Sequence, residues 1–269
     1  PLLAFLHDRA ASGDTPARDM LAATLRNMAA GGLRDHLDGG FFRYTVDGHW
    51  GIPHFEKMLY DNALLLPLYA ESAARSNDRF LRSVAEGIAA WLLGSMYQPG
   101  HGFAASIDAD AAGREGGFHV WRRDEVEQLL SADEFARFAA AYGLDGPPNF
   151  EAESWHLRQR EGTCASDQED PVLSAARLKL LAARARRVAP ATAPKRLTSW
   201  NALAIEGLAR AGLALGREDW VEAAAETLDF IRKSLWAGGD LMAAHDGQQA
   251  RFPAYLDDHA YLLQAVLAL

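Results

Sequence analysis

The feature that most constrains the fold is a helical segment that is apolar on every side. After Asn62 the chain continues with Ala63, Leu64, Leu65, Leu66, Leu68 and Tyr69. At about 100° per residue these side chains point all round the helix axis, so other elements must surround the helix. Polar side chains on its first turns must face one another or a wet cavity, because burying them unpaired is costly. We therefore predict a central helix from Pro53 to about Ser76 whose N-terminal end opens into a site.

Further segments with helical periodicity flank this one. Asp78 is the expected cap of the helix that follows. The other helices are predicted at 2–9, 17–30, 78–97, 124–130, 133–142, 172–188, 199–215, 218–235 and 254–269. Three segments, 40–47, 102–108 and 239–246, each follow a helix, begin with glycine and end in aspartate. This weak repeat indicates an array of helix pairs that closes on itself. Because no stretch is long enough for a sheet, the fold class is all-α, with short β pieces in the loops.

Composition limits the partners. With 269 residues, 49% of them hydrophobic, the chain can bury a sizeable core, and we predict a single domain over 1–269. The net charge of -9 argues against a nucleic-acid partner, which needs clustered Lys and Arg. No apolar run reaches the ~18 residues of a membrane span. The lone cysteine, Cys164, is typical of a reducing compartment, so we expect a cytoplasmic protein. The chain begins at Pro1 without methionine, which suggests a fragment of a longer protein.

Ionisable side chains gather at the start of the central helix. They are His54, Glu56, Lys57 and Asp61. On a helix, His54, Lys57 and Asp61 would share one face. The alternative is a buried structural network, or a simple i,i+4 ion pair between Lys57 and Asp61. We favour a functional cluster, because so many ionisable groups on an apolar helix are costly unless they face water or a ligand.

Four phrases carry a resemblance to a known family: GGFFRYTVDGHWGIPHFEKMLYDNALLL, FAASIDADAAGREGGFHVW, LTSWNALAIEGLARAG and YLDDHAYLLQAVLAL. Together they resemble the spermatogenesis-associated, thioredoxin-like domain family. The larger part of those proteins is similar to the six-hairpin α/α toroids of N-acylglucosamine 2-epimerases and glycosidases. The resemblance covers residues from about 24 to 269, and it implies an α/α toroid with a carbohydrate-related function.

The chain departs from the family pattern in two ways. The thioredoxin-like domain is absent from the sequence, so no redox activity is expected. Six hairpins need twelve helices, whereas the sequence supplies about eight of useful length, so we expect an incomplete or open toroid. An open ring would expose apolar flanks and favour a homodimer. The histidines of the epimerase branch do not align onto positions here, and none is transferred.

In such a toroid, helix starts and the loops before them rim a central funnel. Aromatic faces can hold the apolar side of a pyranose, while charged or amide groups hold its hydroxyls. A tryptophan can instead be part of the hydrophobic core. An aspartate at a helix start can instead cap the helix. The expected substrate-binding residues are Arg43, Tyr44, Trp50, Lys57, Asp108, Asp110, Glu115, Trp200, Asn201 and Asp258.

The leading function is a sugar epimerase or isomerase. Moving a proton at the carbon beside a carbonyl needs acid/base groups of near-neutral pKa, a role that histidine fills best. His54 is the first choice, with His259 or His36 second. The expected catalytic residues are His54, Glu56, Asp61 and His259.

Two other functions stay open. A glycoside hydrolase would pair Glu56 or Asp61 with an opposed carboxylate, Asp108 or Asp258. The third possibility is a non-catalytic binding or scaffold module. We expect no metal and no cofactor, because HExxH is absent and the nine histidines lack ligand spacing.

Overall fold

The computed structural model describes residues 1–160 and 170–269, so Cys164 lies outside the described residues. Its α-helices are α1 (Leu2–Ala11), α2 (Thr15–Ala30), α3 (Leu59–Ser76), α4 (Arg79–Trp91), α5 (Arg123–Leu129), α6 (Ala132–Tyr142), α7 (Pro171–Arg184), α8 (Thr198–Leu215), α9 (Glu218–Phe230) and α10 (Leu256–Ala268). Two π-helical turns, η1 (Leu92–Met96) and η2 (Ile231–Leu235), extend α4 and α9.

The strands are short. They are β1 (Tyr44–Thr45), β2 (Pro53–His54), β3 (Lys57–Met58), β4 (Tyr97–Gln98), β5 (Gly102–Phe103), β6 (Ser106–Ile107), β7 (Asp110–Ala111), β8 (Arg114–Glu115), β9 (Arg196–Leu197), β10 (Trp236–Ala237), β11 (Asp240–His245) and β12 (Ala250–Pro253). Most of them pair only as two-stranded ladders. The largest sheet contains β9, β10, β11 and β12, and β11 pairs with each of the other three. The predicted all-α class with β pieces in the loops is confirmed.

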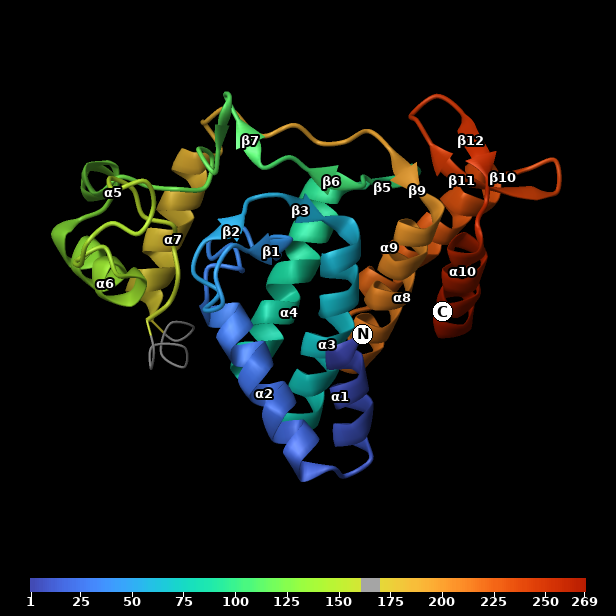
Figure 1. Ribbon diagram of the computed structural model, residues 1–269, viewed down its shortest axis with the longest axis horizontal. Helices are drawn as coiled ribbons and strands as arrows, with labels where there is room; N and C mark the ends of the chain where they lie inside the picture. Colours follow the sequence, from blue (N-terminus) through green and yellow to red (C-terminus); the bar gives the residue numbers. More distant parts are fainter. Residues whose placement is uncertain (161–169) are drawn as a thin grey trace.

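The helices form a two-layered arc of hairpins. Helices α1, α3, α8 and α10 pack one against the next, and α2, α4 and α9 pack behind α1, α3 and α8 (Figure 1). This is the arrangement of an α/α toroid, and over the described residues the arc does not close into a ring. Apolar side chains are exposed on α1 (Leu2, Phe5) and on α10 (Leu263, Val266, Leu267). Association through these flanks remains a prediction.

Local sequence explains where several helices begin and end. The Asp14 side chain accepts a hydrogen bond from the Ala17 amide and caps α2. Asp78 caps α4, as predicted, by accepting from the amides of the second and third residues of the helix. Asn77 ends α3 in the left-handed conformation, which asparagine tolerates better than most residues.

The helix predicted from Pro53 begins only at Leu59, so that prediction was wrong. The preceding residues form β2, paired with β1, and β3, paired with β6. Side chains alternate along an extended chain, so His54 and Glu56 are partly exposed while Phe55 and Lys57 are buried. His54, Lys57 and Asp61 therefore do not share a helix face. Pairing with β1 in a hairpin and with the distant β6 outweighs the local preference of proline for a helix start.

Two segments of the predicted weak repeat, 102–108 and 239–246, follow the two copies of a larger duplication, whereas 40–47 precedes the first copy. The order β3, α3, α4, η1, β4 recurs as β9, α8, α9, η2, β10, each element beginning and ending 139 residues later, as in 59 to 198 for α3 and α8. Asn62 and Asn201 correspond, and both are fully buried. Each is hydrogen-bonded to both backbone groups of a phenylalanine that follows a glycine, Phe41 for Asn62 and Phe103 for Asn201.

A second lobe is inserted between the two copies. Helices α5, α6 and α7 have their own buried cluster, which includes Trp121, Phe138, Trp155, Leu173 and Leu180. The lobe lies beside α2 and the β1–β2 hairpin (Figure 1). The prediction of a single domain over 1–269 remains a prediction.

Close packing joins α3 to α8, the two corresponding inner helices. Pro67 lies inside α3 and has no N–H to donate to the carbonyl of Ala63. Gly207 of α8 faces that carbonyl, and a Cβ at this glycine would lie 2.4 Å from the Ala63 oxygen. Glycine is therefore needed there for close approach of the two backbones.

Candidate functional site

Charged and aromatic side chains meet beside the N-terminal end of α3. Nδ1 of His54 lies 2.7 Å from Oε1 of Glu115, and its ring stacks on Tyr44 with centroids 5.2 Å apart. Glu56 accepts a hydrogen bond from Arg43 at 3.0 Å, and its Oε2 lies 3.7 Å from Nε2 of His54. These side chains are all at least partly exposed. We define the His54 cluster as Arg43, Tyr44, His54, Glu56, Tyr60, Asp61 and Glu115.

Asp61 is the carboxyl of this cluster whose ionisation is most perturbed. Its pKa is raised to about 7, chiefly by burial and further by the charge of Glu56. The charge of Arg43 and a hydrogen bond with Tyr60 act in the opposite direction and lower the pKa. Its Oδ2 atom is buried and has no hydrogen-bond partner among the described residues. Asp61 can therefore hold or release a proton near neutral pH, which is what a general acid/base group requires.

Arg43 and Asp61 also line a cavity of about 440 Å³ between α1, α3 and α8. Most of its lining residues are apolar, among them Leu3 of α1, Leu64 and Leu68 of α3 and Leu203 of α8. Arg210 also lines the cavity and binds both oxygens of Glu71, at 2.8 and 3.2 Å, and Oε1 of Glu206 at 3.0 Å. The cavity thus combines apolar walls with charged groups, a combination typical of small-molecule sites.

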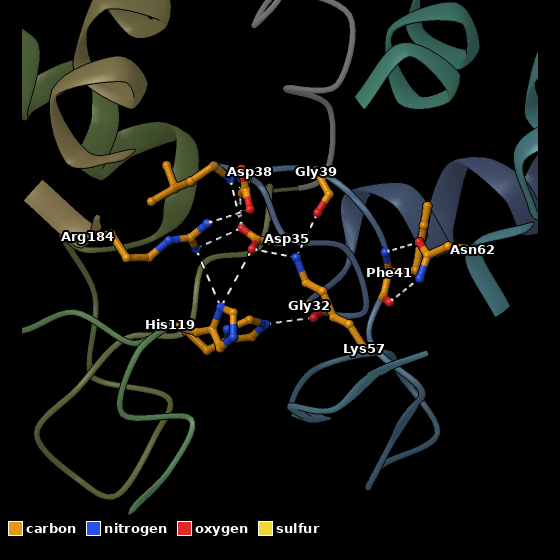
Figure 2. A network of polar contacts seen from close by, with 11 residues as sticks. Gly32, Asp35, Asp38, Gly39, Phe41, Lys57, Asn62, His119 and Arg184 are labelled. Atoms are coloured by element: carbon orange, nitrogen blue, oxygen red, sulfur yellow. Dashed lines mark hydrogen bonds and ion pairs between the residues drawn. The ribbon is translucent and has the colours of Figure 1, made fainter. Parts of the chain in front are cut away.

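Lys57 faces away from the His54 cluster, into a buried network that Figure 2 shows. Its Nζ donates to Oδ2 of Asp35 and to the Gly39 carbonyl, both at 2.8 Å. Arg184 of α7 donates to Oδ1 of the same aspartate at 3.0 Å. Burial alone would raise the pKa of Asp35, but Arg184 and Lys57 hold it well below its usual range. The network fixes β3, which follows Glu56, against the second lobe.

Three buried histidines lie near this network. The Nδ1 atom of His119 is 3.6 Å from Asp35, while His156 and His36 contact the carbonyls of Gly32 and Gly31 at 2.7 and 2.8 Å. Burial lowers the pKa of His36 and His119 to about 3 and that of His156 to about 4. His36, an alternative choice for acid/base chemistry, is therefore neutral at physiological pH.

Predicted residues on α8 and α10 differ in their surroundings. Trp200 corresponds to Asp61 in the duplication, and its ring meets Tyr60 edge-on with centroids 4.8 Å apart. Asn201 is buried and bonded to backbone groups. Asp258 is also buried and accepts from the amides at 199 and 255, which agrees with its capping alternative. His259 is exposed on the first turn of α10, whose helical neighbour is α8 rather than α3.

The other predicted residues lie either near the β7–β8 pair or in a separate cleft that Trp50 lines. Asp108 and Asp110 are exposed, and Asp110 lies opposite Glu115 in the β7–β8 pair. Trp50 lines a different cleft, of about 870 Å³, together with Tyr142 and Trp155. That cleft is larger than the cavity beside Asp61 and holds none of the other predicted site residues.

Sequence reasoning missed Tyr60 and Arg210. Tyr60 stands beside Asp61, and an aromatic residue next to an acidic one at a helix start was the available signal. Arg210 gave no comparable signal, because its place near the cavity depends on how α8 packs against α3.

Within residues 1–160 and 170–269, no group of three or more His, Cys, Asp or Glu side chains is placed to hold a metal ion. No helix in the same part of the chain is long and apolar enough to cross a membrane.

Comparison with curated proteins gives relatives over almost the whole chain. Human spermatogenesis-associated protein 20 is 30% identical over 98% of this chain and 39% of its own length. The chain is similar to one segment of spermatogenesis-associated protein 20. An uncharacterized protein of Caenorhabditis elegans is 32% identical over 93% of this chain and 40% of its own length. The chain thus spans about two-fifths of the length of these relatives. Its similarity to spermatogenesis-associated protein 20 supports the family resemblance found in the sequence.

No protein-family model matches the chain. Among solved structures, a sugar epimerase from a ruminal bacterium has 14% identity and a TM-score of 0.35, covering 99% of this chain and 72% of its own. The cellobiose 2-epimerase of Spirochaeta thermophila also has 14% identity and a TM-score of 0.35, with coverages of 99% and 84%.

Proposed function

We propose that the protein binds a sugar at the His54 cluster and moves a proton at the carbon beside its carbonyl, as an epimerase or isomerase does. The observation that carries this proposal is Asp61, a carboxyl with a pKa of about 7 at the edge of a 440 Å³ cavity. His54 stands in the same cluster. Its Nε2 lies 3.7 Å from Glu56, which accepts a hydrogen bond from Arg43, and the charges of Arg43 and Glu56 both act on the pKa of Asp61. A carboxyl with a near-neutral pKa and an imidazole in one cluster are residue types that a proton shift on a sugar can use.

The chemistry balances with these groups alone. In the open-chain sugar, one group removes the C2 proton, the C2–H bond breaks, and its electron pair forms an enediolate. Arg43 would hold the negative oxygen, since guanidinium hydrogen bonds to anions are strong. Returning a proton to the other face of C2 gives the epimer. Giving it to C1, while the O2 hydroxyl proton passes to O1, gives the ketose. No net proton is gained or lost.

The surroundings could hold the rest of the sugar. Tyr44 is half exposed and Tyr60 packs on Trp200, so these rings offer apolar faces to a pyranose. Glu115 is exposed beside His54 and could accept hydrogen bonds from hydroxyls, with Asp108 and Asp110 on the adjacent loop. Lys57, Asn201 and Asp258, which are buried and bonded within the protein, would position the loops that carry the site.

One observation favours the alternative of a glycoside hydrolase. Glu56 contributes to raising the pKa of Asp61, and a protonated carboxyl beside an ionised one is the pairing that glycosidases use. In that case Asp61 would be the acid and Glu56 the base or nucleophile.

The experiment is proton NMR of the protein in D₂O with a panel of free aldoses and disaccharides. An epimerase or isomerase exchanges the C2 proton for deuterium, whereas a hydrolase releases new reducing ends without that exchange. Asp61→Asn and His54→Gln should each reduce turnover by ~100-fold or more, the usual contribution of a general acid or base. Asp19→Asn, on the exposed face of α2, is the matched control and should keep full activity.

Full turnover in both variants would exclude this site as the place of the chemistry. Absence of turnover with every sugar would overturn the catalytic proposal and leave the non-catalytic binding or scaffold module as the remaining function.

A further inference from the structure

The duplication places Arg196 at the position that Lys57 occupies in the first copy. Lys57 begins β3 and Arg196 begins β9, each five residues before the buried asparagine of the inner helix. In both copies a cation thus stands at the same point, beside a Gly-containing loop that the asparagine fixes.

The two cations differ in what neutralises them. Lys57 is buried against the carboxylate of Asp35 at 2.8 Å. Arg196 forms an ion pair with no carboxylate among the described residues; it donates to Oε1 of Gln98 at 2.6 Å and to the Pro194 carbonyl. Its Nε is buried and has no partner in the described part of the chain. Burial lowers the pKa of Arg196, since its charge is only partly solvated.

A small pocket of about 90 Å³ adjoins this guanidinium. It is lined by Gln98, His101, Arg196, Phe230, His245 and Gly247. Nδ1 of His245 accepts a hydrogen bond from the Gly247 amide at 3.1 Å, so its proton is on Nε2, which is a donor. The neighbouring acid, Asp246, is bound by Arg251 at 2.7 Å and by two backbone amides. The pocket therefore gathers one arginine and two histidines, with no carboxylate among its lining residues.

We propose that this pocket binds a phosphate group, which takes the place that the Asp35 carboxylate has in the first copy. Arginine and histidine supply N–H donors, and arginine hydrogen bonds to phosphate oxygens are strong and directional. The volume suits a phosphate group and excludes a whole sugar, so a phosphate ester would leave its organic part outside. The inference is independent of any chemistry at the His54 cluster, because it shares no residue with that cluster.

The test is isothermal titration of the whole chain with inorganic phosphate and with glucose 6-phosphate, at constant ionic strength and pH 6.5. Arg196→Gln should weaken phosphate binding at least about tenfold, the usual effect of losing a charge-assisted hydrogen bond. The matched control is Arg232→Gln on η2, which removes an exposed arginine paired with Asp229 and should leave the affinity unchanged. Tighter binding of the ester would identify a phosphorylated metabolite as the ligand, and equal binding would identify free phosphate.

A second measurement avoids dependence on the folding of the variant. In the unaltered protein, phosphate should shift the imidazole NMR signals of His101 and His245 while leaving that of the exposed His49 in place. Unchanged affinity in Arg196→Gln, or phosphate that moves neither pocket histidine, would overturn the proposal.

Discussion

Replacing Asp61 by asparagine should change how stability depends on pH. The pKa of Asp61 rises from an ordinary 3.8 to about 7 because of burial. Between pH 3.8 and about 7, Asp61 is ionised in the unfolded chain but keeps its proton in the folded protein. The native state therefore loses stability as the pH rises through this range. At ~1.36 kcal/mol per pKa unit the loss would approach ~4 kcal/mol, and solvent screening of this partly buried group reduces it to ~2 kcal/mol.

Asparagine has nearly the same shape and cannot ionise, so the variant avoids this loss. Urea unfolding at pH values from 4 to 8 should show Asp61→Asn and the unaltered protein nearly equal at pH 4. At pH 8 the variant should be more stable by ~2 kcal/mol. Asp19→Asn, at an exposed position on α2, should show a difference that does not vary with pH. A constant difference for Asp61→Asn as well would refute the raised pKa and the acid/base role built on it.

Three further predictions concern packing, the buried network and association. Gly207→Ala would bring a Cβ to 2.4 Å from the Ala63 oxygen, and we expect a loss of ~1–3 kcal/mol in urea unfolding at any pH. Asp35→Asn leaves two buried cations without their shared carboxylate, so calorimetry should show a marked fall in melting temperature, equivalent to ~3–5 kcal/mol. If the apolar flanks of the arc form a homodimer, sedimentation should show dimer at high concentration, and Leu263→Asp on α10 should abolish it.

The sequence predicted the helical class well because that signal is local and repeated. Apolar periodicity located the α-helices, and the Asp78 cap marked the start of α4. The all-round apolar run after Asn62 correctly indicated a helix buried among others, since α3 contacts both α4 and α8.

The start of α3 could not be predicted in the same way. Pro53 and the charges after it fit a helix start, but hydrogen bonds to β1 and β6 hold this stretch extended. The error matters for the site, because alternation along a strand separates Lys57, which turns inward to Asp35, from His54 and Glu56.

The position of the second lobe was equally hidden from the sequence. Trp50 belongs to the cleft beside that lobe only because the chain between β8 and β9 folds back toward α2. Likewise, basic residues alternate with Leu and Ala over 177–187, a pattern typical of a solvated helix face. Arg184 in this run nevertheless forms a buried ion pair with Asp35, which is 149 residues away. Long-range pairs of this kind leave no local pattern.

The most direct measurement of the central claim is a crystal structure of the protein soaked with the sugar panel. We expect density for a sugar in contact with His54 and Asp61, at the end of the cavity between α1, α3 and α8. Density confined to the cleft beside Trp50, with the His54 cluster occupied by no sugar at saturating concentration, would contradict the account.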